Sequence, residues 1–470
     1  QLESATRGIL GYVINNSFLT APTHRGIRKV LLDISSSLSI INLHGDSNKG
    51  EQAPDGGVDE NVFDIKQGVC ITIGSILSNS NALRSLTLSD VYGKKLDKEN
   101  MLLDGKLIDK IGYSLVPIHP FNFFRKSTTD CIQEYQSWTP VPDWFTNSNT
   151  GIQTKNDALF TDFDLNSLSG RMKDVFENID IDQVKVCSEY NLEDSAGWKI
   201  SKLFNLDFSH ACIHSYLCKP FDHRFIYYHR TALGRSRHST MQHMLKPNLG
   251  LIATRQVTKL PYCHAFVSRW PIEEKTGSHD RTTQLFPLFQ YANEDQLQPT
   301  GSQTSSINPD VASQLADYIG SIKHTPSALP DNDVSSLSIF QYIYSILYSP
   351  QYRKRYGSEL LGDFPRIPFP NSWALFYQLS ELSSKLIDLH LLESHKLAES
   401  KSTYDGIDFP TIEKVQFANN TIWIDKAKTS GFKNIQDEVW NFHIGGYQVC
   451  HKWLKDRQKK GGKNPRPGRI

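Results

Sequence analysis

The alternation of short apolar strands with a helix over the first 80 residues constrains the fold more than any other feature of the sequence. Strands are predicted at residues 9–14, 38–43 and 69–73, each rich in aliphatic and β-branched side chains, and a helix at residues 24–33. A polar loop at residues 44–61 separates the last two strands. This order is typical of an α/β sheet.

The rest of the chain has a different texture and is expected to form a second folding unit. From about residue 117, isolated aromatic side chains stand among Pro, Asn, Ser and Thr residues. A chain of 470 residues is too long for one ordinary domain, and 39% hydrophobic residues are enough for large cores. Asn371 is placed to cap a helix. Its apolar stripe, expected to be buried, is Trp373, Phe376, Leu379, Leu382, Leu386 and Leu389.

Signals of secretion or membrane insertion are not found in the sequence. No apolar run reaches the ~18 residues that a membrane span needs, and no basic start followed by an apolar stretch marks a signal peptide. Seven cysteines are an odd and sparse number, which argues against a disulfide framework. We therefore expect a protein of a reducing cytoplasm with no membrane partner.

The formal net charge of +1 hides a strong local segregation of charge. The stretch 223–270 contains no Asp or Glu, but it contains eight Lys and Arg residues. A second basic stretch, 452–470, holds eight cations and one acidic residue, Asp456. The Gly, Pro and Lys content of this second stretch predicts a disordered tail, whose positive charge needs no function.

Aromatic and histidine side chains are interleaved with the cations of the stretch 223–270, a mixture found on nucleic-acid-binding surfaces. Arg and Lys neutralise phosphates, Arg reads guanine edges, and Gln suits adenine. The candidate DNA-binding residues are Arg224, Tyr227, Arg230, Arg235, Arg237, Arg255, Gln256, Lys259 and Arg269. The alternative is a solvated basic face that acidic neighbours balance elsewhere in the fold.

Two sparse patterns offer metal chemistry as alternatives. His210, Cys212, His214 and Cys218 are ligand types suited to zinc, and the first three would share one face of a strand with Cys218 in a following turn. Ordinary packing is the favoured explanation. Asp55 and the run Asp64-Ile65-Lys66 match a pattern of metal-dependent nucleases, although Asp55 lies in a Gly-rich turn. Neither pattern is specific, and we predict no metal site.

A series of short segments along nearly the whole chain carries a family resemblance. The segments are residues 8–19, 23–26, 53–56, 59–65, 219–222, 224–228, 250–256, 363–368 and 439–449. In this order they resemble the modification and specificity part of single-chain type ISP restriction-modification enzymes, relatives of the type IIG enzymes. These enzymes join an adenine-N6 DNA methyltransferase to a target-recognition domain.

The resemblance implies a domain plan, partners and one site residue. Its parts are residues 1–125, the end of a methyltransferase domain with a partial Rossmann-like α/β sheet; 126–218, a connector; 219–455, an α+β target-recognition domain; and 456–470, a disordered basic tail. It implies double-stranded DNA as partner, S-adenosyl-L-methionine as cofactor and a prokaryotic cytoplasm. In related methyltransferases a phenylalanine that opens a strand stacks on the flipped adenine. Phe63 matches that position best, and a core role is its alternative.

The chain departs from the family at the motifs that carry catalysis. It contains no Gly-x-Gly and no Pro-Pro sequence, so the cofactor-binding turn and the Asn-Pro-Pro-Tyr-type motif are both missing. We therefore expect a fragment that does not transfer methyl groups alone. Its partner would be the missing upstream segment with the catalytic, nuclease and helicase-like parts. The alternative is a non-enzymatic specificity or docking subunit that works with a separate catalytic chain, and an exposed sheet edge would favour it.

Overall fold

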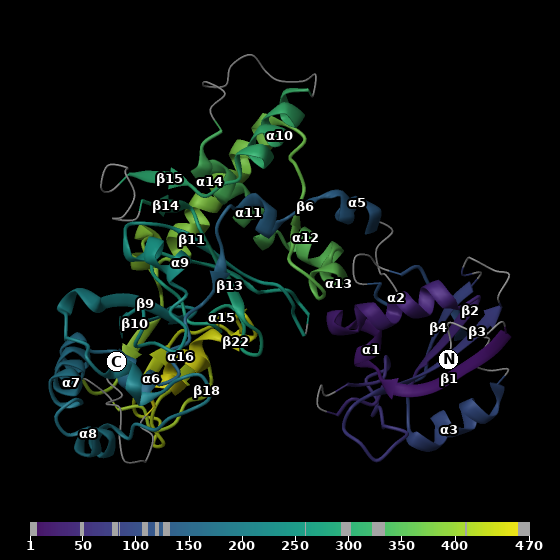
Figure 1. The fold of residues 1–470 in the computed structure, drawn as a ribbon, viewed down its shortest axis with the longest axis horizontal. Helices are drawn as coiled ribbons and strands as arrows, with labels where there is room; N and C mark the ends of the chain where they lie inside the picture. The colour runs from purple at the N-terminus through teal and green to yellow at the C-terminus, as the bar shows by residue number, and fades with distance from the viewer. Residues whose placement is uncertain are drawn as a thin grey trace. The chain divides into compact units, whose positions relative to one another are not determined.

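The structure, a computed structural model, describes residues 7–47, 51–77, 83, 85–105, 111–117, 122–125, 132–258, 260–292, 302–321, 334–408 and 411–458. The chain divides into two units, Gln1–Ile132 (unit 1) and Gln133–Ile470 (unit 2), each of which is described by itself. It is a mixed α/β protein with several separate sheets (Figure 1). In the described ranges no helix combines the length and the apolar character that crossing a membrane requires.

Unit 1 contains a five-stranded mixed sheet with the order β1-β3-β2-β4-β5. Its elements are β1 (Arg7–Asn15), α1 (Ser17–Thr20), α2 (Arg25–Ile34), β2 (Ser37–Asn42), β3 (Val69–Leu77), β4 (Ser85–Asp90), α3 (Lys95–Leu103) and β5 (Tyr113–Ser114). Strands β2 and β4 are parallel, whereas β3 runs antiparallel to β1 and β2. The predicted strands and helix are therefore confirmed as β1, β2, β3 and α2.

Helices α2 and α3 lie on opposite faces of the unit 1 sheet (Figure 1). Leu31 of α2 packs in a core with Leu38 and Ile40 of β2. On the other face, Met101 of α3 packs against a smaller cluster that contains Ile41 of β2. Both contacts follow from the alternation of side chains along β2, which sends neighbouring residues to opposite faces.

The face of the unit 1 sheet against which α3 packs is left uncovered near β1. Ile9 is 84% exposed, Val13 52% and Ile73 43%. The register sets Gly11, which lies between Ile9 and Val13, opposite Ile73, so these three side chains share one face of neighbouring strands. Among the described strands β1 is also at the edge of the sheet. Unit 1 thus presents an apolar edge and face.

A buried ion pair organises the loop between β2 and β3. The Nζ atom of Lys98 lies 2.7 Å from Oδ1 of Asp59, and both side chains are fully buried. The same ammonium group donates hydrogen bonds to the backbone carbonyls of Leu43 and Glu60 at 2.6 and 2.7 Å. The described part of the predicted polar loop is therefore tied to α3.

The first part of unit 2 packs helices against a three-stranded sheet with the order β8-β10-β9. Its elements are α6 (Asp157–Phe160), β8 (Thr161–Asp162), α7 (Leu165–Asn178), α8 (Gln183–Tyr190), β9 (Ile213–Lys219) and β10 (Asp222–Tyr227). Met172 and Phe176 of α7 share a core with Tyr216 and Ile226 of the sheet. The predicted connector at 126–218 is therefore wrong from residue 133 onward, because its apolar side chains build this core.

The central sheet of unit 2 has the order β12-β11-β13-β7. Its strands are β7 (Asn149–Thr150), β11 (Gly250–Thr254), β12 (Ala265–Ser268) and β13 (Thr283–Pro287). Ile252 and Leu285 lie in the core shared with β9 and β10. On the other face, the ring of Phe286 contacts those of Phe145 and Phe364. Both faces of this sheet are therefore covered.

Helices α11 (Ser336–Tyr348) and α14 (Trp373–His390) pack side by side in unit 2 (Figure 1). The predicted stripe of α14 is confirmed at Trp373 and Phe376 but is wrong farther along, because Leu382 is 61% exposed. The buried face continues instead through Ser380, Ser383, Ile387 and His390. The small Ser380 permits a close approach and donates a hydrogen bond to the Ser338 carbonyl at 3.0 Å. Ser372, not Asn371, caps the helix.

The last part of unit 2 is a four-stranded sheet, β17-β20-β19-β18, against which α16 (Val449–Arg457) packs. Its strands are β17 (Thr403–Asp405), β18 (Gln416–Ala418), β19 (Thr421–Trp423) and β20 (Gly431–Lys433). The predicted tail at 456–470 is wrong at its start, because Asp456 and Arg457 are helical and Arg457 is buried. Residues 459–470 lie outside the described residues.

Short elements complete unit 2. They are α5 (Ile132–Ser137, at the division), β6 (Thr139–Pro140), α9 (His238–Met241), β14 (Phe289–Tyr291), β15 (Gln303–Ser305), α10 (Pro309–Gly320), α12 (Pro350–Arg355), α13 (Gly357–Leu360), β16 (Arg366–Ile367), α15 (Asp437–Trp440), β21 (His443–Ile444) and β22 (Tyr447–Gln448).

Candidate nucleic-acid interface

The pairing of strands in the central sheet of unit 2 brings several distant loops to one end. Thr254, the last residue of β11, pairs with Thr283, the first residue of β13. The N–H of Gly151, just after β7, donates to the Thr283 carbonyl at 3.1 Å. The chain therefore leaves β11, enters β13 and leaves β7 at the same place, which we call the Thr254 end.

The loop before β13 closes over the Thr254 end. The backbone N–H of Gly277 donates to Oγ1 of Thr283 at 3.1 Å, and Oγ1 of Thr254 donates to the Gly277 carbonyl at 3.4 Å. A Cβ atom on Gly277 would lie 2.9 Å from methyl groups of Ile252 and Thr283, so only glycine fits without a shift. The close approach fixes the course of residues 277–282.

A hairpin from the end of the chain supports this loop. Gly445 and Gly446 form the turn between β21 and β22 with φ values of +61° and +78°, which favour glycine. The N–H of Gly445 donates to the carbonyl of Cys263 at 2.8 Å, and its carbonyl accepts from the N–H of His279 at 2.9 Å. A Cβ on Gly445 would lie 2.3 Å from the Gly277 carbonyl oxygen. The hairpin and the two loops are thus in direct backbone contact.

Asp280 lies within this loop and is fully engaged by neighbouring hydroxyl groups. Thr258 and Ser278 donate hydrogen bonds to its carboxylate at 2.8 and 3.0 Å. Burial alone would raise the pKa of Asp280, but these hydrogen bonds outweigh it and hold the pKa below its usual value. The carboxylate therefore stays ionised and joins the loop before β13 to the loop after β11.

Exposed cations gather at the Thr254 end. Arg235 is exposed, and its backbone exchanges two hydrogen bonds with Gln153, of 3.0 and 2.8 Å. The Arg255 side chain is 53% exposed and that of Arg281 48%. Arg255 lies 2.9 Å from Asp363, but a pair this exposed contributes little and can exchange its partner for a phosphate. The arrangement suits a polyanion.

The structure brings only part of the predicted DNA-binding residues to this end. Arg235, Arg255 and Gln256 lie there by strand register. Arg230 and Arg237 lie on the loop between β10 and α9, Arg230 exposed and Arg237 half-buried. Their roles as DNA contacts stay predictions. Lys259 lies outside the described residues.

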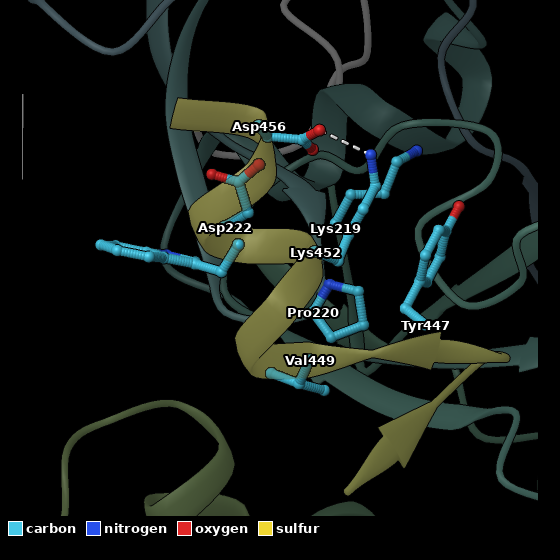
Figure 2. A pocket seen from close by; sticks show the side chains of 8 residues that line it. Lys219, Pro220, Asp222, Tyr447, Val449, Lys452 and Asp456 are labelled. Carbon is cyan, nitrogen blue, oxygen red and sulfur yellow. Dashed lines mark hydrogen bonds and ion pairs between the residues drawn. The ribbon is translucent and has the colours of Figure 1, made fainter. Parts of the chain in front are cut away.

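Arg224 and Tyr227 are corrected as DNA-binding candidates because β10 buries them. Arg224 is 8% exposed and its guanidinium lies 2.6 Å from Asp222, while Arg457 of α16 reaches the other carboxylate oxygen of Asp222 at 2.9 Å. Figure 2 shows Asp222 beside α16 and Asp456 on that helix, where Asp456 accepts a hydrogen bond from Lys452 at 2.6 Å. Tyr227 is fully buried. The ion pairs of Asp222 and Arg224 with Arg457 and Asp456 join β10 to α16.

Arg269 lies at the opposite end of the central sheet. It follows Ser268, which pairs with Gly250 at the start of β11. Its guanidinium donates two hydrogen bonds to the Glu393 carboxylate, at 2.8 and 2.7 Å. These contacts hold its pKa above the usual value. Arg269 therefore does not belong to the cation group of the Thr254 end.

Phe63 lies in the loop before β3 of unit 1. Its ring is 44% exposed, which excludes the core alternative. Its backbone N–H donates to Oδ1 of Asn61 at 2.9 Å, and β3 begins only at Val69, so Phe63 does not open the strand. Stacking on a flipped adenine stays a prediction for this exposed ring.

The carboxyl ends of the parallel strands β2 and β4 hold a polar cluster around His44. The Nδ1 atom of His44 lies 2.6 Å from Glu51 and Nε2 lies 2.8 Å from Asp90, while the ring stacks on Tyr92 at 3.9 Å between centroids. Burial alone would lower the pKa of His44, but the hydrogen bonds to Asp90 and Glu51 outweigh it and raise the pKa. The cluster fills this end of the sheet.

The two sparse metal patterns do not assemble in the structure. His210 and Cys212 lie in a 3₁₀ turn before β9, so the predicted common strand face with His214 is wrong. Asp55 and Asp64 lie in turns of the loop before β3, and Asp64 is fully exposed beside Lys95. Within the described ranges no group of three or more His, Cys, Asp or Glu residues could hold a metal ion.

Sequence reasoning missed the cations that lie outside the acid-free stretch. Lys155 follows β7, and Lys275 and Arg281 lie on the loop before β13. All three are exposed. Each has acidic sequence neighbours, so a search for acid-free segments passes over them.

The chain is therefore a mixed α/β protein with several separate sheets, and its central sheet in unit 2 has a basic end. The fold is similar to three solved structures. The first is the ATP-dependent type ISP restriction-modification enzyme LlaBIII bound to DNA, with 18% identity, a TM-score of 0.69, and coverage of 98% of this chain and 30% of that chain. The second is a nuclease-deletion mutant of the type ISP restriction-modification enzyme LlaGI in complex with a DNA substrate mimic, with 21% identity, a TM-score of 0.67, and coverage of 98% of this chain and 36% of that chain. The third is DrdV in a complex with DNA, with 18% identity, a TM-score of 0.66, and coverage of 97% of this chain and 46% of that chain.

Residues 143–466 match the type ISP C-terminal specificity domain. This match covers more than half of the chain, and the chain therefore belongs to that family. It spans less than half the length of each of the three solved structures. No curated protein matches the chain.

Proposed function

We propose that this chain recognises a specific duplex DNA sequence within a site-specific adenine-N6 DNA methyltransferase of a restriction-modification system. The observation that carries the proposal is the convergence of Arg235, Arg255 and Arg281 on the Thr254 end, within the family's specificity domain. Similar folds bound to DNA support it. Exposed guanidinium groups there neutralise phosphates and fix the register of the duplex, and polar side chains between them read base edges.

Methyl transfer belongs to the whole protein in this proposal. Unit 1 forms the end of the methyltransferase sheet, and Phe63 stacks on the adenine that is turned out of the duplex. S-adenosyl-L-methionine does not fit the described residues of this chain. The carboxyl ends of β2 and β4, where an α/β sheet binds such a ligand, are filled by His44, Glu51 and Asp90. The cofactor therefore binds to an upstream segment, and the chain alone is inactive.

A binding experiment on the full 470-residue chain tests the proposal. A random duplex library is selected on the chain, and affinity for the enriched sequence is measured against a scrambled duplex over a range of salt. We expect tighter binding of the enriched sequence, and a smaller salt slope, by about 1 to 2, in the double variant Arg235→Ala, Arg255→Ala. Arg269→Ala is the matched control and should bind like the wild type. Equal affinity for all duplexes at moderate salt would refute sequence recognition.

A second candidate function, a docking subunit for a separate catalytic chain, is favoured by the open apolar face of unit 1. Ile9, Val13 and Ile73 lie uncovered on it, and β1 lies at the edge of the described sheet. Co-purification with a chain that carries the missing motifs, and methyl transfer only in the mixture, would support this candidate. Methyl transfer by a single longer polypeptide would support the first.

A further inference from the structure

A small hollow lies beside Arg235 at the Thr254 end. Its volume is 230 Å³, and its lining is Ile152, Gln153, Thr154, Lys155, Asp157, Glu273 and Glu274. The backbone of Gln153 pairs with that of Arg235, and the N–H of Ile152 donates to the Ile272 carbonyl at 2.8 Å. The hollow is therefore built on paired backbone, and its residue Gln153 is bonded to the backbone of the exposed Arg235.

One acceptor of this hollow has no partner. The Oε1 atom of Gln153 is buried and accepts no hydrogen bond from the residues that the structure describes. An unsatisfied buried acceptor costs on the order of 1–3 kcal/mol, so a donor from outside is strongly favoured there. The same holds for Oγ1 of Thr150 and Oε1 of Gln284, which lie opposite each other in the β7–β13 register. Three polar side-chain oxygens near this end of the sheet thus lack partners among the described residues.

The charges around the hollow select the kind of donor. Asp157, Glu273 and Glu274 bring three carboxyl groups to the lining, against the ammonium of Lys155. Glu273 pairs with Lys219 of β9, and Asp157 accepts a hydrogen bond from the hydroxyl of Thr154. The remaining excess of acceptors repels a phosphate and attracts an amino group. The positive charge of Arg235, which is not part of the lining, instead attracts a phosphate and repels an amino group that carries positive charge.

Resting on the proposed function, we propose that Gln153 is a specificity-determining residue that accepts a hydrogen bond from the exocyclic amino group of one target base, adenine or cytosine. A side-chain amide can also donate to N7 of adenine, which makes a bidentate contact in the major groove. Arg235 holds the neighbouring phosphate, and the acidic lining keeps the backbone out of the hollow. Gln153 lies outside the acid-free stretch 223–270, where composition places the DNA contacts.

The test removes single amino groups from the duplex that the chain itself selects. Each adenine is replaced in turn by purine, which lacks the 6-amino group, and each cytosine by the pyrimidinone that lacks the 4-amino group. We expect one position at which this change weakens binding by the wild-type chain about tenfold. Gln153→Met should be insensitive at that position and normal elsewhere. The identity of the sensitive base distinguishes adenine from cytosine.

Two further variants make the outcome decisive. Gln153→Asn withdraws the acceptor oxygen by one methylene, so it should lose most of the sensitivity at that position and supplies the answer if Gln153→Met fails to fold. Gln303→Leu, an exposed glutamine of β15, should behave like the wild type at every position. If the wild type selects a sequence but Gln153→Met keeps its full pattern of sensitivity, the inference is wrong and the proposed function stands. If the wild type binds all duplexes alike, both are wrong.

Discussion

The sheet of unit 1 and the central sheet of unit 2 bury their apolar side chains to different extents. In unit 2 Leu251 and Ile252, which point to opposite faces of β11, are both fully buried. In unit 1 Leu10 packs in the core, but its neighbour Ile9 is 84% exposed on the other face. Burying such a side chain contributes about 1.5–3 kcal/mol. The central sheet of unit 2 is therefore covered on both faces, whereas the sheet of unit 1 leaves one face exposed near β1.

The largest expected effect comes from the buried ion network of unit 2. Asp222→Ala would leave the guanidinium groups of Arg224 and Arg457 buried without their carboxylate, at a cost of about 3–5 kcal/mol in the free energy of unfolding. Because every tryptophan lies in unit 2, urea unfolding followed by tryptophan fluorescence measures this unit alone. Asp405→Ala, which removes an exposed partner of Lys433, is the control and should change the value by less than about 0.5 kcal/mol.

Truncation of the central sheet should cost somewhat less. Leu251→Ala removes a fully buried side chain from β11, and we expect a loss of about 2–5 kcal/mol because the covered sheet cannot collapse around the space. The same fluorescence measurement applies. A loss below about 1 kcal/mol would mean that this face of the sheet is not a closed core, and the contrast with unit 1 would fail.

Unit 1 should show a pH dependence that unit 2 does not share. The raised pKa of His44 means that its contribution to stability is complete below its usual value of 6.5 and is lost as the pH rises through the folded pKa. The lowered pKa of Asp90 adds a contribution that is lost as the pH falls well below 3.8. Hydrogen exchange of peptides from residues 38–90 should therefore quicken above neutral pH, beyond the intrinsic rise in exchange rate.

His44→Asn is the matched variant for this experiment, since Asn tolerates the positive φ of 51° at that position. It should remove the pH-dependent step, whose slope is bounded by about 1.4 kcal/mol per pH unit for one proton. An unchanged step in His44→Asn would assign the titration to another group.

The smallest effect is expected on the open face of unit 1. Val13→Thr keeps a β-branched side chain and removes exposed apolar surface, so the stability of this chain should change by less than about 0.5 kcal/mol. Circular dichroism and hydrogen exchange of the β1 peptide measure it. In a longer protein or a complex that covers this face, the same change should weaken the contact by about 1 kcal/mol or more. A large loss in this chain alone would show that the face is already covered.

The sequence predicted those parts of the fold that depend on neighbouring residues. The strands and helix of unit 1 follow from local apolar patterns, and so does the start of α14. Arg224 was misassigned because one of its partners, Asp456, is more than 200 residues away in the chain. The alternation of Asp222, Arg224 and Ile226 along one face of a strand was a usable signal for burial.

The candidate site depends on register more than on composition. Gln153, Arg235 and Arg281 come together only because β7, β11 and β13 pair as they do. An acid-free stretch identified Arg235, and it missed Gln153 and Arg281, whose segments also contain carboxylates. A search by composition finds the cations of a DNA-binding surface and overlooks the uncharged side chains placed between them.

The turn formed by Gly445 and Gly446 has a consequence for the order of synthesis. The loop at 277–282 leaves the ribosome long before the hairpin that supports it. Until β21 and β22 emerge, Gly277 can keep its hydrogen bonds with Thr254 and Thr283, but the backbone N–H of His279 lacks its acceptor, the Gly445 carbonyl. Under the proposed function, we therefore expect the Thr254 end to bind a duplex fully only after these late residues have been translated.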